Sequence, residues 1–385
     1  MEGLRNHFLL QPDVVFLNQG SYGACPHPVF ESYQNWQLEL ERQPVQFIGR
    51  RAEGLLCQAR EALGNFVGAD PDDLVYTPNA TTGLNTVARS LSLEPGDEVL
   101  TTDHEYGALD RTWDFICAKR GARYIHQPVP LPAESPEQLV EAIWSGVTER
   151  TRVLFFSHIS SPTALIFPVA RLVARAREAG IITVVDGAHA PGQLDLDLDS
   201  LNADFYAGNC HKWMMTPKGS GFLHVRRSMQ PQMEPLVVSW GWGREEPLVS
   251  PFIDSQQYQG TRDIAAYLAV PAAIQFMEDH DWPAVRRACH ELVRLARRQV
   301  AALTGQPPLT PDHPDWFAQM AVLPLSPCDG TELYRRLYEE YNVEIPITTW
   351  NERQFARISV QGYNTREDVE TLVRGLTALL PEVVV

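Results

Sequence analysis

The chain has 385 residues, 44% of them hydrophobic, and its 48 acidic and 32 basic residues give a formal net charge of −16. This length predicts one large and one smaller domain rather than a single small core. The acidic balance argues against nucleic-acid binding, which needs a basic surface, and against anionic membranes. No apolar run is long enough to span a membrane, and the segment Met1–Phe8 lacks the basic and apolar regions of a secretory signal. We therefore expect a cytoplasmic protein with neither nucleic acid nor membrane as a partner.

The six cysteines show no pairing pattern. None of them forms a Cys-x-x-Cys motif, and their spacing suits neither a zinc site nor a disulfide framework. We expect reduced thiols and no metal site; the six are Cys25, Cys57, Cys117, Cys210, Cys289 and Cys328.

Short β-rich segments alternate with helical segments between about residues 55 and 225. The stretch 169–179 has helical periodicity and stops before Gly180. Strands that alternate with helices predict a mainly parallel sheet covered on both faces, with ligands beyond the carboxyl ends of the strands. The expected strands are 73–77, 98–102, 123–128, 152–157, 181–186, 204–207 and 221–225.

The pattern changes after about Pro251 to that of a smaller α+β domain. Thr365 and Asp368 have the spacing of a capping box for a final helix that ends near Leu380. We expect a large domain over residues 15–255 and a small domain made of 1–14 and 256–385. In the second half, the expected helices are 281–303 and 331–341, and the expected strands are 317–323, 343–347 and 356–360.

Asp186 and Lys212 suggest a pyridoxal phosphate (PLP) site. Asp186 ends an apolar strand in Val-Val-Asp-Gly-Ala-His, and Lys212 follows in Asn-Cys-His-Lys-Trp. A lysine amine forms a Schiff base with the PLP aldehyde, while a carboxylate keeps a proton on the pyridine nitrogen. Taken alone, the two residues also fit an ordinary strand-end aspartate and a surface lysine.

A phosphate site is predicted where Asn79–Asn85 follows a strand and opens a helix. Free backbone N–H groups and the positive dipole end at a helix N-terminus attract anions, and Thr81 and Thr82 add hydroxyl donors. A simple N-cap role for either threonine is the alternative.

Further candidates lie beyond other strand ends. Tyr106 or His104 could stack on a cofactor ring, and Ser160 could bond the ring oxygen or the substrate. His189 could reach the ring oxygen, and His211 could donate to the phosphate. Each of these side chains has a structural alternative in loop or core packing.

Arg357 lies in a strand-like run of the small domain. An arginine fork binds a carboxylate through two hydrogen bonds, which an amino-acid enzyme needs in order to orient the Cα–H bond of its substrate. The alternative is a surface arginine on an edge strand.

Together these segments resemble the class V aminotransferase family of fold-type I PLP enzymes, and within it the isopenicillin N epimerase-like branch. The resemblance implies an α/β fold-type I transferase with a mainly parallel, helix-covered sheet in the large domain and a smaller α+β C-terminal domain. The runs that carry it are 16–24, 78–86, 102–108, 186–192, 211–213, 217–221, 260–263 and 357–365, in the family's order.

The resemblance also implies roles for single residues. Lys212 matches the Schiff-base lysine, Asp186 the partner of the pyridine nitrogen and Tyr106 the ring-stacking residue. Thr261 resembles a residue that reaches the phosphate of a neighbouring subunit, which implies a homodimer. The remaining matches are His189 near the ring oxygen, Ala80, Thr81, Thr82, His211 and Asn209 at the phosphate, Arg357 as the α-carboxylate clamp and Asn18 on a loop over the site.

Two departures from the family pattern lie close to the substrate side: Gln19 where histidine is frequent, and Ala164 where Thr-Gly is frequent. Residues 343–355 contain no cysteine, so the persulfide chemistry of cysteine desulfurases is not expected.

We expect Cα deprotonation of a small amino acid. The favoured outcome is β-elimination from a cysteine-derived substrate, that is, a C–S lyase; an epimerase or an aminotransferase is the alternative. Epimerisation requires a second acid on the opposite face, for which Tyr106, His104 and Ser160 are candidates. Two other classes are disfavoured. A non-catalytic PLP-fold protein would be expected to lack Lys212, and a nicotinamide oxidoreductase would carry Gly-x-Gly-x-x-Gly after the first strand.

Overall fold

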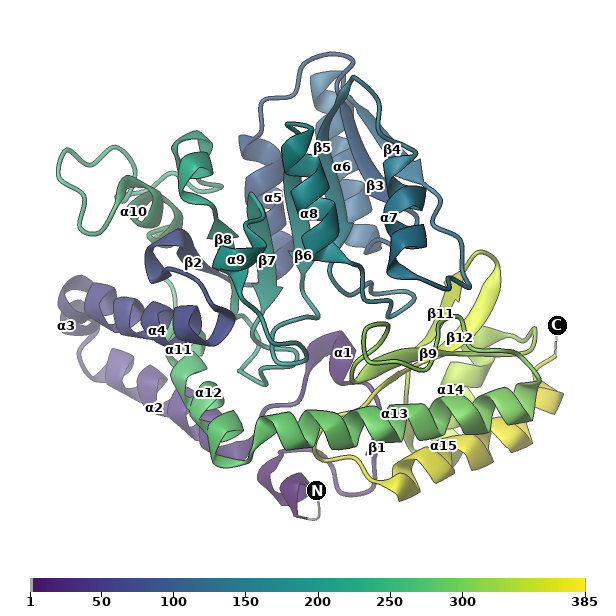
Figure 1. Cartoon of the computed structure of the whole chain (residues 1–385). Helices are drawn as coiled ribbons and strands as arrows, with labels where there is room; N and C mark the ends of the chain where they lie inside the picture. The colour runs from purple at the N-terminus through teal and green to yellow at the C-terminus, as the bar shows by residue number, and fades with distance from the viewer. Residues whose placement is uncertain (1–2, 385) are drawn as a thin grey trace.

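The computed structural model describes residues 3–384, in which a seven-stranded sheet forms the centre of the molecule (Figure 1). The strand order is β2-β8-β7-β6-β5-β3-β4, and every neighbouring pair is parallel except those that involve β8. The predicted mainly parallel sheet is therefore confirmed. Its strands are β2 (Leu74–Thr77), β3 (Glu98–Thr102), β4 (Arg123–Gln127), β5 (Thr151–Ser157), β6 (Ile182–Gly187), β7 (Phe205–Asn209) and β8 (Gly221–Val225).

Helices cover both faces of this sheet because alternate side chains of its buried strands point to opposite sides. In β5, Val153 and Phe155 belong to one apolar cluster, whereas Leu154 and Phe156 belong to the other. Helices α5 (Ala80–Ser90) and α6 (Gly107–Arg120) pack on the first side, and α7 (Pro136–Trp144) and α8 (Val169–Glu178) on the second (Figure 1). Loops from the carboxyl ends of the parallel strands consequently meet at one edge.

The C-terminal part packs against this edge (Figure 1). An antiparallel sheet of order β11-β12-β9 contacts the long helix α13, which in turn packs on α15. The predicted capping box of α15 is present, with both Thr365–Asp368 hydrogen bonds formed. The elements are β9 (Met320–Pro324), β11 (Ile347–Trp350), β12 (Arg353–Ser359), α13 (Trp282–Thr304), α14 (Gly330–Tyr341) and α15 (Arg366–Leu379).

The strand predicted over 343–347 is two separate strands. β10 (Val343–Glu344) pairs in parallel with β1 (Val15–Phe16), whereas β11 pairs with β12. Pro346 separates them because proline has no N–H to donate to a ladder. β12 also begins earlier than predicted, since Asn351 and Glu352 adopt positive φ and form the two-residue turn of a hairpin.

Among the remaining helices, α2 and α4 pack against α11 and α12, whereas α9 contacts α8 and α10 contacts β2. The predicted division into residues 15–255 and 1–14 with 256–385 stays a prediction, and residues 1, 2 and 385 of the latter lie outside the described residues. Within 3–384, no helix is long and apolar enough to cross a membrane. The helices are α1 (Gln19–Tyr22), α2 (His27–Arg42), α3 (Pro44–Gln46), α4 (Ala52–Val67), α9 (Leu198–Leu201), α10 (Pro251–Gln257), α11 (Ala265–Leu268) and α12 (Val270–Asp279).

Candidate active site

Lys212 lies on the loop after β7, with its amine facing His189. Lys212 Nζ is 3.1 Å from His189 Nε2, and the Trp213 indole N–H donates to His189 Nδ1 at 3.3 Å. An indole nitrogen can only donate, so Nδ1 accepts and the neutral imidazole carries its proton on Nε2. The Nε2–H group then points at the lysine amine, which can accept it only when the amine is neutral.

The electrostatics of the site favour the same protonation states. Burial lowers the pKa of Lys212 to about 8; the Asp186 charge opposes this shift and the Arg357 charge adds to it. Burial also holds the pKa of His189 well below its usual range. Lys212 therefore loses its proton above about pH 8, where an ordinary lysine is still charged.

Asp186 lies near the carboxyl end of β6, where the sheet topology predicts a ligand site. Its carboxylate is buried and accepts the Ala188 backbone N–H at 2.9 Å. Burial raises the pKa of this carboxyl, and the charge of Lys212 lowers it. A protonated pyridine nitrogen would supply a positive partner for this buried carboxylate.

Behind Asp186 lies a carboxyl group that the sequence analysis did not single out. Glu105 is buried and accepts hydrogen bonds from Thr102 Oγ1 and Ser157 Oγ, both at 2.6 Å. Burial raises its pKa to about 8, and the charge of Asp186 contributes to this rise. Glu105 is thus protonated at neutral pH, which leaves Asp186 as the charged carboxylate. Its place in the run 102–108, just past a strand, was the available signal.

The phosphate cradle is predicted at the first turn of α5. Asn209 Oδ1 accepts the Ala80 N–H at 2.9 Å, and Asn79 Oδ1 caps the helix by accepting the Thr82 N–H at 2.8 Å. Among the hydrogen bonds of residues 3–384, none uses the amide or hydroxyl of Thr81. These two donors remain available to an anion at the helix N-terminus.

His211 is held beside this helix by the end of β8. Its Nδ1 donates to the Ser220 carbonyl at 2.8 Å. Gly221, the next residue, lies so close to Asn79 that an added Cβ would come within 2.9 Å of the Asn79 Cα. Burial lowers the pKa of His211 to about 4, so its Nε2 carries a lone pair rather than a proton. A hydrogen bond to phosphate would need either a proton on the phosphate or a negative charge on the phosphate that favours protonation of His211.

Arg357 on β12 is buried, at 6% exposure, and contacts only neutral groups. It donates to Ser161 O at 2.7 Å, to Ser161 Oγ at 3.0 Å and to Ser21 Oγ at 3.2 Å. Its Nε has no hydrogen-bond partner, and no carboxylate of residues 3–384 forms an ion pair with it. A buried guanidinium without a counter-charge is costly, so the site is arranged for an incoming anion.

The N-terminal loop joins these groups. Asn18 accepts from Ser21 Oγ at 2.6 Å and donates to Glu344 Oε1 at 2.9 Å; through Ser21 it is two hydrogen bonds from Arg357. Gln19, a departure from the family pattern, donates to the Lys212 carbonyl at 2.7 Å and accepts from the Tyr363 hydroxyl at 2.8 Å. Gln19 thus joins the lysine segment to Tyr363 near the C-terminus, a contact that was not predicted from the sequence.

Three of the predicted site residues form no hydrogen bond with Lys212 or Asp186 within residues 3–384. Ser160 is fully buried, bonding Thr163 Oγ1 at 2.6 Å and accepting the Leu165 N–H at 3.1 Å. Tyr106, the N-cap of α6, is 46% exposed; burial lowers the pKa of Arg357 to about 10, and the interaction with Tyr106 opposes this shift. Thr261 is exposed on the bend before α11.

The residues described fit PLP. The chain contains three lysines, and Lys119 and Lys218 are both exposed, which leaves Lys212 as the least exposed amine. The buried Asp186, the open donors of Thr81 and the unpaired Arg357 match a pyridine nitrogen, a phosphate and a substrate carboxylate respectively.

Comparison with known proteins decides the family, because the sequence profile of Aminotransferase class-V matches residues 23–372. The chain belongs to this family. Isopenicillin N epimerase from Streptomyces clavuligerus is 38% identical, over 99% of this chain and 98% of its own. Putative L-cysteine desulfhydrase 1 from Oryza sativa subsp. japonica is 29% identical, over 96% and 84%. A solved structure of a C-DES mutant, with glycine covalently linked to its PLP cofactor, matches with a TM-score of 0.82 at 23% identity, over 97% and 99%.

Family membership makes this chain a PLP-dependent enzyme of class V, as the sequence predicted. The expected resemblance to the isopenicillin N epimerase-like branch and the expected fold are also confirmed. The roles of single residues stay predictions.

The pKa of Lys212 leads to a test on protein freed of cofactor. Only the neutral amine reacts with acetic anhydride, so acetylation of Lys212 is expected to rise about tenfold per pH unit up to about pH 8 and then to level off. Peptide mass spectrometry measures each lysine separately, and exposed Lys119 serves as the reference for reagent decay. A rate at Lys212 that still climbs tenfold between pH 9 and pH 10 would contradict the assignment.

Proposed function

We propose that this enzyme removes the Cα proton of a small amino acid and that its main reaction is β-elimination from a cysteine-derived substrate, a C–S lyase reaction. The observation that carries the proposal is the combination of a neutral Lys212 amine with a buried Arg357 that has no acidic partner. One group can accept a proton, and the other can bind the carboxylate attached to the same carbon.

Each residue then has a defined task. When bound, PLP supplies an electron sink for the electron pair that deprotonation leaves at Cα. Arg357 binds the α-carboxylate through its fork and fixes the Cα–H direction. Lys212 takes the proton at Nζ, and His189 Nε2–H orients that amine. Asp186 holds a negative charge toward the pyridine nitrogen, while Thr81, Thr82, Ala80, Asn209 and His211 hold the phosphate region.

β-Elimination needs no second acid, and the hydrogen bonds of the site favour it on this ground. His104 and Ser160 were candidate acids for epimerisation. Both ring nitrogens of buried His104 are occupied, by Thr163 Oγ1 and Val129 O, each at 2.8 Å. Ser160 is engaged by the same threonine. Of the three candidates, only the exposed Tyr106 keeps a hydroxyl outside this network.

An epimerase is the second candidate, because 38% identity to isopenicillin N epimerase over nearly the whole chain exceeds the 29% identity to the desulfhydrase. In that reaction Tyr106 would return the proton to the opposite face of Cα. An aminotransferase remains the third possibility from the sequence analysis.

The test is a panel of S-substituted L-cysteines and their sulfoxides given to the cofactor-loaded enzyme. We expect pyruvate and ammonia from at least one member, released together with the sulfur group. A D-amino acid without pyruvate would instead establish an epimerase, and a keto acid that keeps its β-substituent an aminotransferase. Either of these results would refute the lyase proposal.

The role of Arg357 predicts a specific kinetic loss. Arg357→Gln is expected to reduce kcat/KM for the best amino acid about 30- to 1,000-fold, because losing one partner of a buried charge pair costs about 2–4 kcal/mol. The same variant should lose little further activity on an S-substituted cysteamine, which has no carboxylate. Arg353→Gln, at the start of the same strand, is the matched control. Equal losses on both substrates would contradict a carboxylate clamp.

We also propose a cytoplasmic homodimer in which Thr261 reaches the phosphate of the second copy. Trp240 and Trp242, 80% and 61% exposed, lie on the segment before α10, and a second copy would cover them. No disulfide links the cysteines within residues 3–384, which suits a reducing compartment. Sedimentation equilibrium should return twice the chain mass of 43.3 kDa; a monomer at assay concentration would overturn this proposal.

A further inference from the structure

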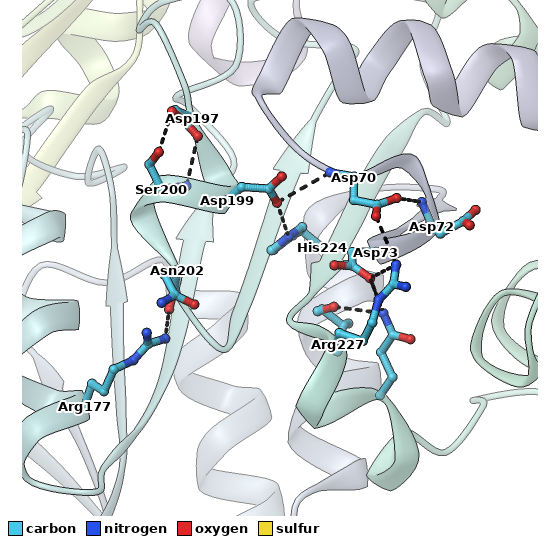
Figure 2. A network of polar contacts seen from close by, with 12 residues as sticks. Asp70, Asp72, Asp73, Arg177, Asp197, Asp199, Ser200, Asn202, His224 and Arg227 are labelled. Atoms are coloured by element: carbon cyan, nitrogen blue, oxygen red, sulfur yellow. Dashed lines mark hydrogen bonds and ion pairs between the residues drawn. The ribbon is translucent and has the colours of Figure 1, made fainter.

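A second cluster of polar groups lies at the end of the sheet opposite to the phosphate cradle. His224 on β8 stands across the ladder from Leu74 at the start of β2, whereas Gly221 at the other end of β8 pairs with Thr77, just before Asn79 and α5. Asp73 ends the short segment Pro71–Asp73, and Asp199 lies on α9. Figure 2 shows the His224 ring between the carboxylates of Asp199 and Asp73. One ligand atom from each of the three residues lies within 4.8 Å of the other two.

His224 has an environment that protein contacts leave incomplete. The residue is 3% exposed, yet neither of its ring nitrogens has a hydrogen-bond partner within residues 3–384. Buried polar groups without partners are rare and call for a missing water or ion. Its Nε2 lies 3.8 Å from Asp199 Oδ1, which is too long for a hydrogen bond. It is the separation expected of two ligands of one cation, because bonds of about 2.0–2.2 Å place neighbouring ligands about 3–4 Å apart.

The surroundings hold Asp73 in place for such a role. Arg227 Nε and Gln230 Nε2 both donate to Asp73 Oδ1, at 3.0 and 2.7 Å, and no donor of the described residues reaches Oδ2. A ligating carboxylate is commonly oriented in this way by outer hydrogen bonds.

The charges around the cluster also favour a cation. Asp70, Asp73 and Asp199 carry three negative charges, and Arg227, which bonds Asp70 and Asp73, carries one positive charge. A divalent cation would balance the remaining two charges. The side chain of Asp199 is 55% exposed, so solvent reaches the cluster and water can complete the coordination.

We propose that His224, Asp73 and Asp199 bind a divalent transition-metal cation of the Zn²⁺ or Mn²⁺ type. One imidazole with two carboxylates suits such borderline ions better than Ca²⁺, which prefers an all-oxygen shell. The cation accounts for the unpartnered Nε2 of His224 and ties β8, α9 and the start of β2 together. β8 and β2 carry the phosphate cradle at their other ends. The cation would therefore stabilise the large sheet rather than take part in the reaction. No metal site was expected from the sequence, because the spacing of the cysteines gave no signal for one and His224, Asp73 and Asp199 lie far apart in the chain.

The experiment uses cofactor-loaded enzyme dialysed against a chelator and then titrated with Zn²⁺. Calorimetry should show one site per chain, and the thermal midpoint should rise with Zn²⁺. Asp199→Asn changes an exposed side chain and is expected to weaken binding at least tenfold without loss of folding. Asp197→Asn is the matched control, because it lies on the same segment but outside the cluster and its side chain can still cap α9; its affinity should equal that of the wild type.

Co²⁺ separates this site from the cysteines. Bound at His224, it should give visible d–d bands without the near-ultraviolet charge-transfer band of a thiolate, and His224→Gln should abolish them. Zn²⁺ binding of equal strength in the wild type, Asp199→Asn and His224→Gln would overturn the proposal, as would the absence of any binding by the wild type. None of these readouts depends on turnover, so they stand apart from the test of the proposed reaction.

Discussion

The proposed proton removal depends on a lysine amine that can become neutral inside the site. Lys212 loses its charge above about pH 8 because burial disfavours the ammonium and lowers its pKa, and His189 presents an N–H to it rather than a lone pair. Trp213 fixes that orientation by donating to the other ring nitrogen. A charged Lys212 would have no capacity to accept a proton and would pair with Asp186, which is needed elsewhere. Burial and the hydrogen bonds among Lys212, His189 and Trp213 thus favour the neutral form of the Lys212 amine.

Burial decides which of the ionisable side chains around Lys212 carry a charge. Glu105 is a carboxylic acid at neutral pH, which leaves Asp186 as the anion beside it. Arg357 lies across the site as a cation with no anion of its own. The pattern of an unpaired anion, an unpaired cation and a neutral base matches a bound zwitterionic amino acid and a protonated pyridine ring. It would be an expensive arrangement if the site had only a structural purpose.

Much of this site could be predicted from the sequence because the relevant residues follow strands. Asp186 lies at the end of β6, and Thr81 and Lys212 follow β2 and β7 within four residues; strands that run in the same direction bring their carboxyl ends to one edge. Contacts between distant segments could not be predicted in this way. Nothing in a single sequence indicates that Gln19 bonds the Lys212 carbonyl, because the two residues are 193 positions apart and meet only in the folded chain.

The differences from prediction at the strand over 343–347, and at His104 and Ser160, have local causes. The segment 343–347 was predicted to be one strand, but Pro346 interrupts it and its two parts pair in different sheets. His104 and Ser160 were placed correctly past strand ends, yet Thr163 bonds both of them, so they support a loop.

The central claim is that Lys212 removes the Cα proton, and proton exchange measures this directly. L-Alanine has no leaving group, so the cofactor-loaded enzyme in D₂O should replace its Cα–H with deuterium, as followed by NMR. Lys218→Ala should exchange like the wild type, and Lys212→Ala should not exchange when loaded with the same cofactor. Exchange by Lys212→Ala at the wild-type rate would contradict the account.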